Sequence, residues 1–257
     1  MNNLSTNTPK GLSRHGLRIW GLMFLVLGIA GKSILQNRML GVGSISNEEL
    51  LKLIQNQDQF AMASVAIVLQ FVMACAIPIF VYLLVDGFGR TSSFKNYLLR
   101  LTGVAVLSEL PFNFAMSGKL LDLNSRNPVF AMVLGLVMLY IFQYYAGTGF
   151  KNVLIKVMVV ALSILWVDML RITDGAAIVV MVSALWALRK NRSLQIFGGC
   201  AAMFVCTIFS PFYLAAPLLF LTVHFYNGEP GDENKIINYL AYPAILLAIG
   251  LVAKFAF

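Results

Sequence analysis

The chain has 257 residues, of which 59% are hydrophobic and only 12% are charged, and its mean hydropathy is +0.80. Soluble domains are about 45–50% apolar and about 25% charged, so this composition excludes an ordinary soluble domain. The net charge of +8 does not indicate nucleic-acid binding, because the basic residues lie at the ends of apolar runs, as they do on one face of a membrane. Repeated apolar runs of about 15–25 residues predict an all-α polytopic membrane protein, a helical bundle in contact with lipid.

Nine apolar runs follow one another along the chain, and each predicts a membrane-spanning helix. A polar segment, residues 1–16, precedes the first run, which has no small-residue cleavage site and so predicts an uncleaved first span. Residues 17–257 are expected to form one transmembrane domain. The predicted spans are residues 17–35, 60–85, 97–116, 128–146, 152–170, 174–190, 194–209, 211–226 and 236–256.

Local sequence features add detail to this pattern. Pro78 lies inside the long second run and predicts a tilt or kink there. The seventh and eighth runs are joined only by Ser210-Pro211, which predicts a tight hairpin or a re-entrant pair. The extramembrane loop at about 36–58 contains "SNEELLKLI", in which a serine precedes a glutamate by three residues. This capping-box spacing predicts a short amphipathic helix at the membrane surface.

Lysine and arginine concentrate in the N-terminal segment and in alternate connections. Because basic residues favour the cytoplasmic side of a membrane, this alternation predicts a cytoplasmic N-terminus and an external C-terminus. The acidic connection "NGEPGDENK" is the one weak fit, and acidic residues have little effect on topology. The basic residues used for this orientation are Lys10, Arg14, Arg18, Arg90, Lys95, Arg100, Lys151, Arg189, Lys190 and Arg192.

Two charged residues, Arg100 and Glu109, lie inside the apolar run of the third predicted span. A charge held in lipid costs at least ~2.5 kcal/mol, so such a residue indicates a functional site. Glu109 and Asn113 are four residues apart and project from one face of a helix. A carboxylate held away from water is suited to general acid–base catalysis or to proton transfer, which we predict for Glu109.

More polar residues are expected near Glu109 on the external side, namely Asn127, Asp168, Arg171 and Asp174. Asp168 and Asp174 flank Arg171, so the alternative is an interfacial salt bridge between Arg171 and one of these aspartates. The sequence has no histidine, cysteine and aspartate cluster with the spacing of a zinc site, so no metal is expected.

Six segments have the order and approximate spacing of one known family. They are "IPIFVYLLVDGFGRT", "KNYLLRL", "SELPFNF", "RNPVFAMVLGLVML", "TDGAAIVVMV" and "INYLAYPAILLAIGL". Together they cover more than half of the chain and resemble the TraX family, membrane proteins associated with N-acetylation of conjugative pilin. That family is similar to the polytopic acyltransferases that use cytoplasmic acyl-CoA. The resemblance implies an acyltransferase-like fold, a bacterial cytoplasmic (inner) membrane location, and a peptide or pilin-like acceptor.

The resemblance also implies roles for individual residues. Acetyl-CoA or another acyl-CoA is the expected co-substrate. Its phosphates would be held by Arg90, Lys95 and Arg100 at the cytoplasmic face. Glu109 or Asp174 would act on the acceptor as the catalytic group. The residues expected to bind the substrate are Asn113, Asn127, Asp168, Arg171 and Tyr242.

The chain departs from the family pattern at three places. The first helix of the family usually carries an Asp-His pair, where this chain has only apolar residues and glycine at Leu27–Gly31. The last helix usually has a histidine two residues after its proline, where this chain has Ile245, and the tyrosine expected after Asp174 is absent. Losing both histidines removes the obvious general base. Either Glu109 or Asp174 has taken that role, or the scaffold is kept without the reaction.

Two other functions therefore stay open. The first is a non-catalytic membrane subunit of a conjugation or secretion apparatus, or one that binds a peptide substrate. The second is a small-molecule or proton-coupled transporter, which would also use buried carboxylates. The sequence shows no inverted repeat of the kind many transporters have, which disfavours the transporter. The sequence does not predict an oligomeric state.

Overall fold

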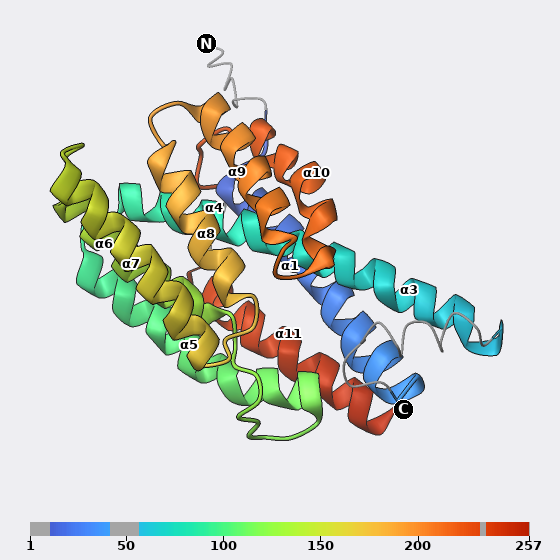
Figure 1. Cartoon of the computed structure of the whole chain (residues 1–257). Coiled ribbons are helices and arrows are strands. Elements are labelled where there is room, and N and C mark those ends of the chain that lie inside the picture. Colours follow the sequence, from blue (N-terminus) through green and yellow to red (C-terminus); the bar gives the residue numbers. More distant parts are fainter. Residues whose placement is uncertain (1–10, 42–56, 232–234, 257) are drawn as a thin grey trace, which may run out of the picture.

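The computed structural model describes residues 11–41, 57–231 and 235–256, and their regular elements are all helices (Figure 1). The all-α prediction is therefore confirmed. The expected amphipathic helix and most of the N-terminal segment lie outside the described residues. The helices are α1 (Arg14–Ala30), the π-helix η1 (Gly31–Met39), α3 (Gln57–Ala74), α4 (Ala76–Arg90), α5 (Phe94–Ser117), α6 (Val129–Tyr144), α7 (Phe150–Met169), α8 (Gly175–Ala187), α9 (Arg192–Cys206), η2 (Pro211–Ala215), α10 (Ala216–Phe220), η3 (Leu221–Phe225) and α11 (Lys235–Phe255).

Five stretches of the described chain are long and apolar enough to cross a membrane: Arg14–Met39, Gln59–Arg90, Phe94–Ser117, Phe150–Met169 and Ile237–Phe255. Three further apolar helices, α6, α8 and α9, are shorter. All nine predicted runs are helical, but the eighth is divided among η2, α10 and η3. The structure therefore supports a membrane helical bundle without establishing nine complete spans.

The kink predicted at Pro78 is present as a break between α3 and α4. Pro78 has no N–H to donate to the carbonyl of Ala74, so a continuous helix would lose a hydrogen bond there. The chain instead turns at Cys75, whose N–H donates to the carbonyl of Val72 at 3.2 Å. α3 and α4 thus form one apolar stretch of 32 residues in two pieces.

The helices α1 and α3 cross closely because glycines face the crossing. A Cβ atom at Gly28 would lie 2.1 Å from the Cβ of Met73, and one at Gly31 would lie 2.6 Å from the Cβ of Leu69. Small residues permit such approach between membrane helices. Both glycines belong to the stretch in which the family has its Asp-His pair.

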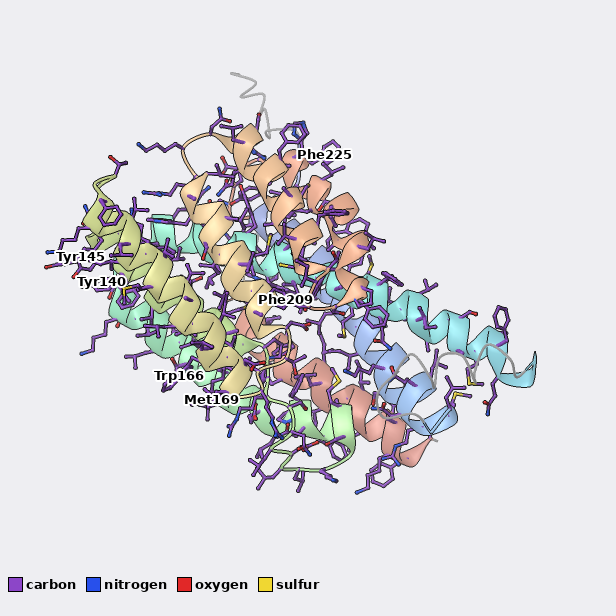
Figure 2. The ribbon with its side chains drawn as sticks, in the orientation of Figure 1. Tyr140, Tyr145, Trp166, Met169, Phe209 and Phe225 are labelled. Atoms are coloured by element: carbon purple, nitrogen blue, oxygen red, sulfur yellow. The ribbon has the colours of Figure 1, made fainter. Side chains whose placement is uncertain are left out.

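Burial separates the inner helices from the outer ones. α8 is apolar all round and its side chains are mostly buried, as expected of a central helix. α7 lies at the edge of the bundle, where Trp166 and Met169 point outward with 55% and 69% of their surface exposed (Figure 2). An exposed apolar face of this kind suits contact with lipid.

Connections far apart in the sequence meet at two ends of the bundle. At one end, the N–H of Leu12 donates to the carbonyl of Phe225 at 2.7 Å. At the other end, the N–H of Arg126 donates to the carbonyl of Arg171 at 2.9 Å. Each bond joins segments that the sequence assigned to one membrane side. The structure therefore agrees with the predicted alternation, while the side that each end faces stays a prediction.

The crossing of α1 and α3 gives a direct test. Gly28→Ala should destabilise the protein by about 1–3 kcal/mol, because the added methyl group overlaps Met73 and forces the helices apart. Gly103→Ala on α5 is the matched control, since no atom lies within 4 Å of its added Cβ. Melting temperatures in detergent measure both effects. Equal melting temperatures for Gly28→Ala and the unchanged protein would contradict the close crossing.

Candidate functional site

A cavity of about 660 Å³ lies among α1, α4, α5 and α11, and the start of α6 also lines it. The polar lining residues of α1 and α5 come from one end of each helix, where Arg18 and Arg100 lie. Farther along, the same helices contribute Leu25 and Val104. The cavity thus has a basic mouth, near the connection between α4 and α5, and an apolar interior that extends to Tyr242 on α11.

Asp86 organises the mouth of this cavity. Its carboxylate accepts hydrogen bonds from Arg14 at 3.2 Å, from Nε of Arg90 at 3.0 Å, and from the hydroxyl of Tyr226 at 2.9 Å. Arg90 also donates to the carbonyl of Gly228 at 2.8 Å. Because Asp86 offsets the charges of two adjacent arginines and fixes their guanidinium groups, both can line one cavity.

Of the three residues predicted to bind phosphate, two line the cavity and one does not. All three residues are exposed, but Arg90 and Arg100 line the cavity, whereas Lys95 lies outside its lining. An α-helix turns about 100° per residue, so Lys95 projects away from the face that carries Asn96 and Arg100. Arg18, which the sequence linked only to membrane orientation, also lines the cavity.

Glu109, Asn127 and Tyr242 form one hydrogen-bonded group at the start of α6. Oε2 of Glu109 accepts from the N–H of Asn127 at 3.1 Å. The side-chain oxygen of Asn127 accepts from the N–H of Val129 and from the hydroxyl of Tyr242, each at 3.0 Å. Glu109 thus supplies a negative charge where a helix N-terminus favours one, which is a structural role.

The other substrate-binding residues predicted on α5 and α7 are dispersed. Asn113 is buried in α5, and its side-chain oxygen has no hydrogen-bond partner among the described residues. Asp168 is exposed at the end of α7. Arg171 donates to the side-chain oxygen of Asn124 at 3.0 Å. Within the described ranges Arg171 forms no ion pair with an aspartate, so the alternative salt bridge is absent.

Asp174 lies in the connection between α7 and α8 and faces a second cavity of about 230 Å³. Its backbone has a positive φ of 58°, which is uncommon for a residue with a side chain. Its carboxylate accepts a hydrogen bond from the hydroxyl of Tyr213.

Tyr242 lines the first cavity and is joined to Glu109 through Asn127. Asp174 lines the second cavity and not the first. Of the two carboxylates that were predicted to be catalytic, the structure therefore connects Glu109 to the apolar end of the first cavity.

Sequence reasoning missed Asp86, Tyr213 and Lys32 as site residues. The contact of Asp86 with Arg90 was predictable, because oppositely charged residues four apart on a helix commonly pair. No local pattern indicates the bond from Tyr226 to Asp86 or the bond from Tyr213 to Asp174, since these partners are 140 and 39 positions apart.

Comparison with known proteins identifies a family for this chain. Residues 50–253 match the family model described as TraX protein. This range contains α3 to α10 and most of α11, and therefore most of the lining of the first cavity, while α1 and η1 precede it. No curated protein and no solved structure matches the chain.

The bond from Asn127 to Glu109 predicts a stability effect. Glu109→Gln should cost about 0.3–1 kcal/mol, because it removes a charge that stabilises the start of α6 but keeps an acceptor oxygen. Glu109→Ala should cost about 1–3 kcal/mol, because the N–H of Asn127 loses its partner. Thermal unfolding in detergent measures both, with the exposed Glu229→Gln as control. A Glu109→Gln protein with unchanged stability and no acyl transfer would instead support a catalytic role.

Proposed function

The chain belongs to the TraX family, and we propose that it is a membrane acyltransferase that transfers an acetyl or other acyl group from acyl-CoA to an acceptor. The observation that carries this proposal is the first cavity, which combines an arginine-rich mouth with an apolar interior. Acyl-CoA has the same division, because its phosphates are anionic while its pantetheine arm and acyl group are far less polar.

The mouth suits the phosphates of CoA. Arg18 and Arg100 lie there beside the Asp86-bound Arg14 and Arg90. Guanidinium groups bind phosphate oxygens in pairs of parallel hydrogen bonds. The side chains of Ser92, Ser93 and Asn96 add further polar groups to the lining. The thioester would then lie deeper, between the apolar residues and Tyr242.

Transfer requires the acceptor to lose a proton. Its nitrogen or oxygen forms a bond to the thioester carbonyl carbon, the carbon–sulfur bond breaks, and CoA leaves as its thiolate. We propose that Asp174 accepts this proton, because Glu109 already accepts a hydrogen bond from the N–H of Asn127. Asp174 lines the second cavity, so the acceptor would have to reach from that cavity to the thioester.

A non-catalytic TraX-like subunit is the second candidate, and one observation favours it. The two regions in which the family has histidines meet in an apolar cluster that contains Ile29, with Ile245 and Tyr242 packed against it. The buried members of that cluster among the described residues are all apolar, so none of their side chains could accept a proton. A protein of this kind would bind acyl-CoA or a peptide without transferring the acyl group.

We further propose nine spans in a bacterial inner membrane, with the N-terminus in the cytoplasm and the C-terminus outside. The basic mouth would then open toward cytoplasmic acyl-CoA, and a peptide or pilin-like acceptor would arrive from the other side. Support comes from the positive residues gathered at that end of the bundle, including Arg14, Arg90 and Arg192.

Acyl-CoA binding is tested by melting temperature in detergent. Acetyl-CoA should raise it, whereas free acetate should not. Arg100→Ala should weaken binding by about 1.5–3 kcal/mol, the scale of hydrogen bonds to charged groups. Lys95→Ala is the matched control and should change the affinity little, because Lys95 lies outside the cavity lining. The proposal fails if acetyl-CoA gives no shift, or if both variants weaken binding equally.

Orientation is tested with single cysteines in a protein whose three native cysteines are replaced. In intact cells an impermeant thiol reagent should label Asp122→Cys, in the α5–α6 connection, but leave Asn191→Cys, before α9, unlabelled. Both positions should react once the cells are opened, which controls for accessibility. Labelling of Asn191→Cys in intact cells would reverse the orientation.

A further inference from the structure

We propose that the second cavity is a binding site for a small zwitterion of amino-acid size. It is formed by η1, α3, η2 and the connection between α7 and α8, which lie far apart in the sequence. Its volume of about 230 Å³ would hold about seven waters at their share of liquid volume, or a compact organic molecule. This inference does not rest on acyl-CoA binding, because the two cavities have no lining residue in common. The two proposals share only Asp174, the proposed proton acceptor of the transfer.

The charges of the cavity define the ligand. Lys32 from η1 and Asp174 line the same space, but no ion pair within 4 Å joins them among the described residues. Asp174 is held instead by the hydroxyl of Tyr213. Lys32 and Asp174 are both partly buried. Opposite charges that share a cavity without touching leave a gap between them, and charges removed from water are costly unless they are paired. A molecule with an ammonium group and a carboxylate would pair with both.

Neutral polar groups complete the site. The side-chain amides of Gln36 and Gln70 are buried and hydrogen-bonded to each other. That bond uses the NH2 of Gln70 and the oxygen of Gln36. The NH2 of Gln36 and the oxygen of Gln70 form no hydrogen bond with the described residues, so both can bind a ligand. Ser210 adds a hydroxyl. The ligand can therefore form hydrogen bonds along its length as well as ion pairs at its ends.

Two backbone features support a functional role for this cavity. η1 is a π-helix of nine residues, and π-helical segments are rare and frequent at functional sites. Asp174 is held at a positive φ, a strained conformation that proteins retain chiefly where the surrounding structure requires it. Both features place charged side chains, Lys32 and Asp174, in the cavity wall.

The probes are glycine, L-alanine and β-alanine, which place the two charges at different separations. Each is added at up to 10 mM to the purified protein in detergent, and the melting temperature is recorded. We expect at least one to raise it in a saturable manner. Sodium acetate and ethylammonium chloride carry one charge each and should leave it unchanged, because neither can bridge Lys32 and Asp174.

Substitutions locate the effect. Lys32→Met and Asp174→Asn should each weaken the zwitterion-dependent shift at least tenfold in half-saturating concentration. The controls Lys119→Met and Asp122→Asn change charges outside the cavity lining and should leave the shift intact. If Asp174→Asn does not fold, Gln70→Leu replaces it, because Gln70 lines the same cavity.

Three results would overturn the proposal. One is the absence of a shift with all three zwitterions. Another is an equal shift with the singly charged salts, and the last is an undiminished shift in the cavity variants. Any of these would mean that this cavity does not bind a zwitterion.

Discussion

The arrangement of the basic cavity depends on the carboxylate of Asp86. It joins the start of α1, the end of α4 and the segment after η3 through Arg14, Arg90 and Tyr226. Two arginines at one cavity mouth would repel each other without this carboxylate. Because a partly buried charge pair becomes strongly unfavourable when one partner is lost, the contact fixes how these three elements meet. The mouth is therefore a product of long-range packing.

That arrangement explains the charges inside apolar runs. Arg100 lies at the cavity mouth, and Glu109 accepts a hydrogen bond at the start of α6. The two residues are on one helix but serve different regions. Tyr242 links the apolar end of the cavity to Glu109 through Asn127. The site is built from α1, α4, α5 and α11, while α7 contributes nothing to either cavity lining.

Helices and their interruptions were predictable, because apolar run length and Pro78 act locally. The proximity of Arg90 and Arg100 was also predictable, since both lie near the connection between α4 and α5. The direction in which Lys95 projects from α5 was not predictable. Neighbouring residues of a helix project about 100° apart, so a shift of one position decides whether a side chain enters the cavity. The pairing of Asp174 with Tyr213 and its sharing of a cavity with Lys32 depend on how distant helices pack, so spacing in the sequence gives no sign of them.

The short length of α6 and α9 has a consequence for the surrounding bilayer. α6 has 16 residues and α9 has 15, which correspond to about 24 and 22 Å of helix. The hydrocarbon core of a typical bilayer is about 30 Å thick. This hydrophobic mismatch is relieved when lipid thins beside these helices, at a cost that grows with each ångström. We therefore expect the protein to favour thin bilayer regions and to deform the membrane unequally, more beside α6 and α9 than beside α7.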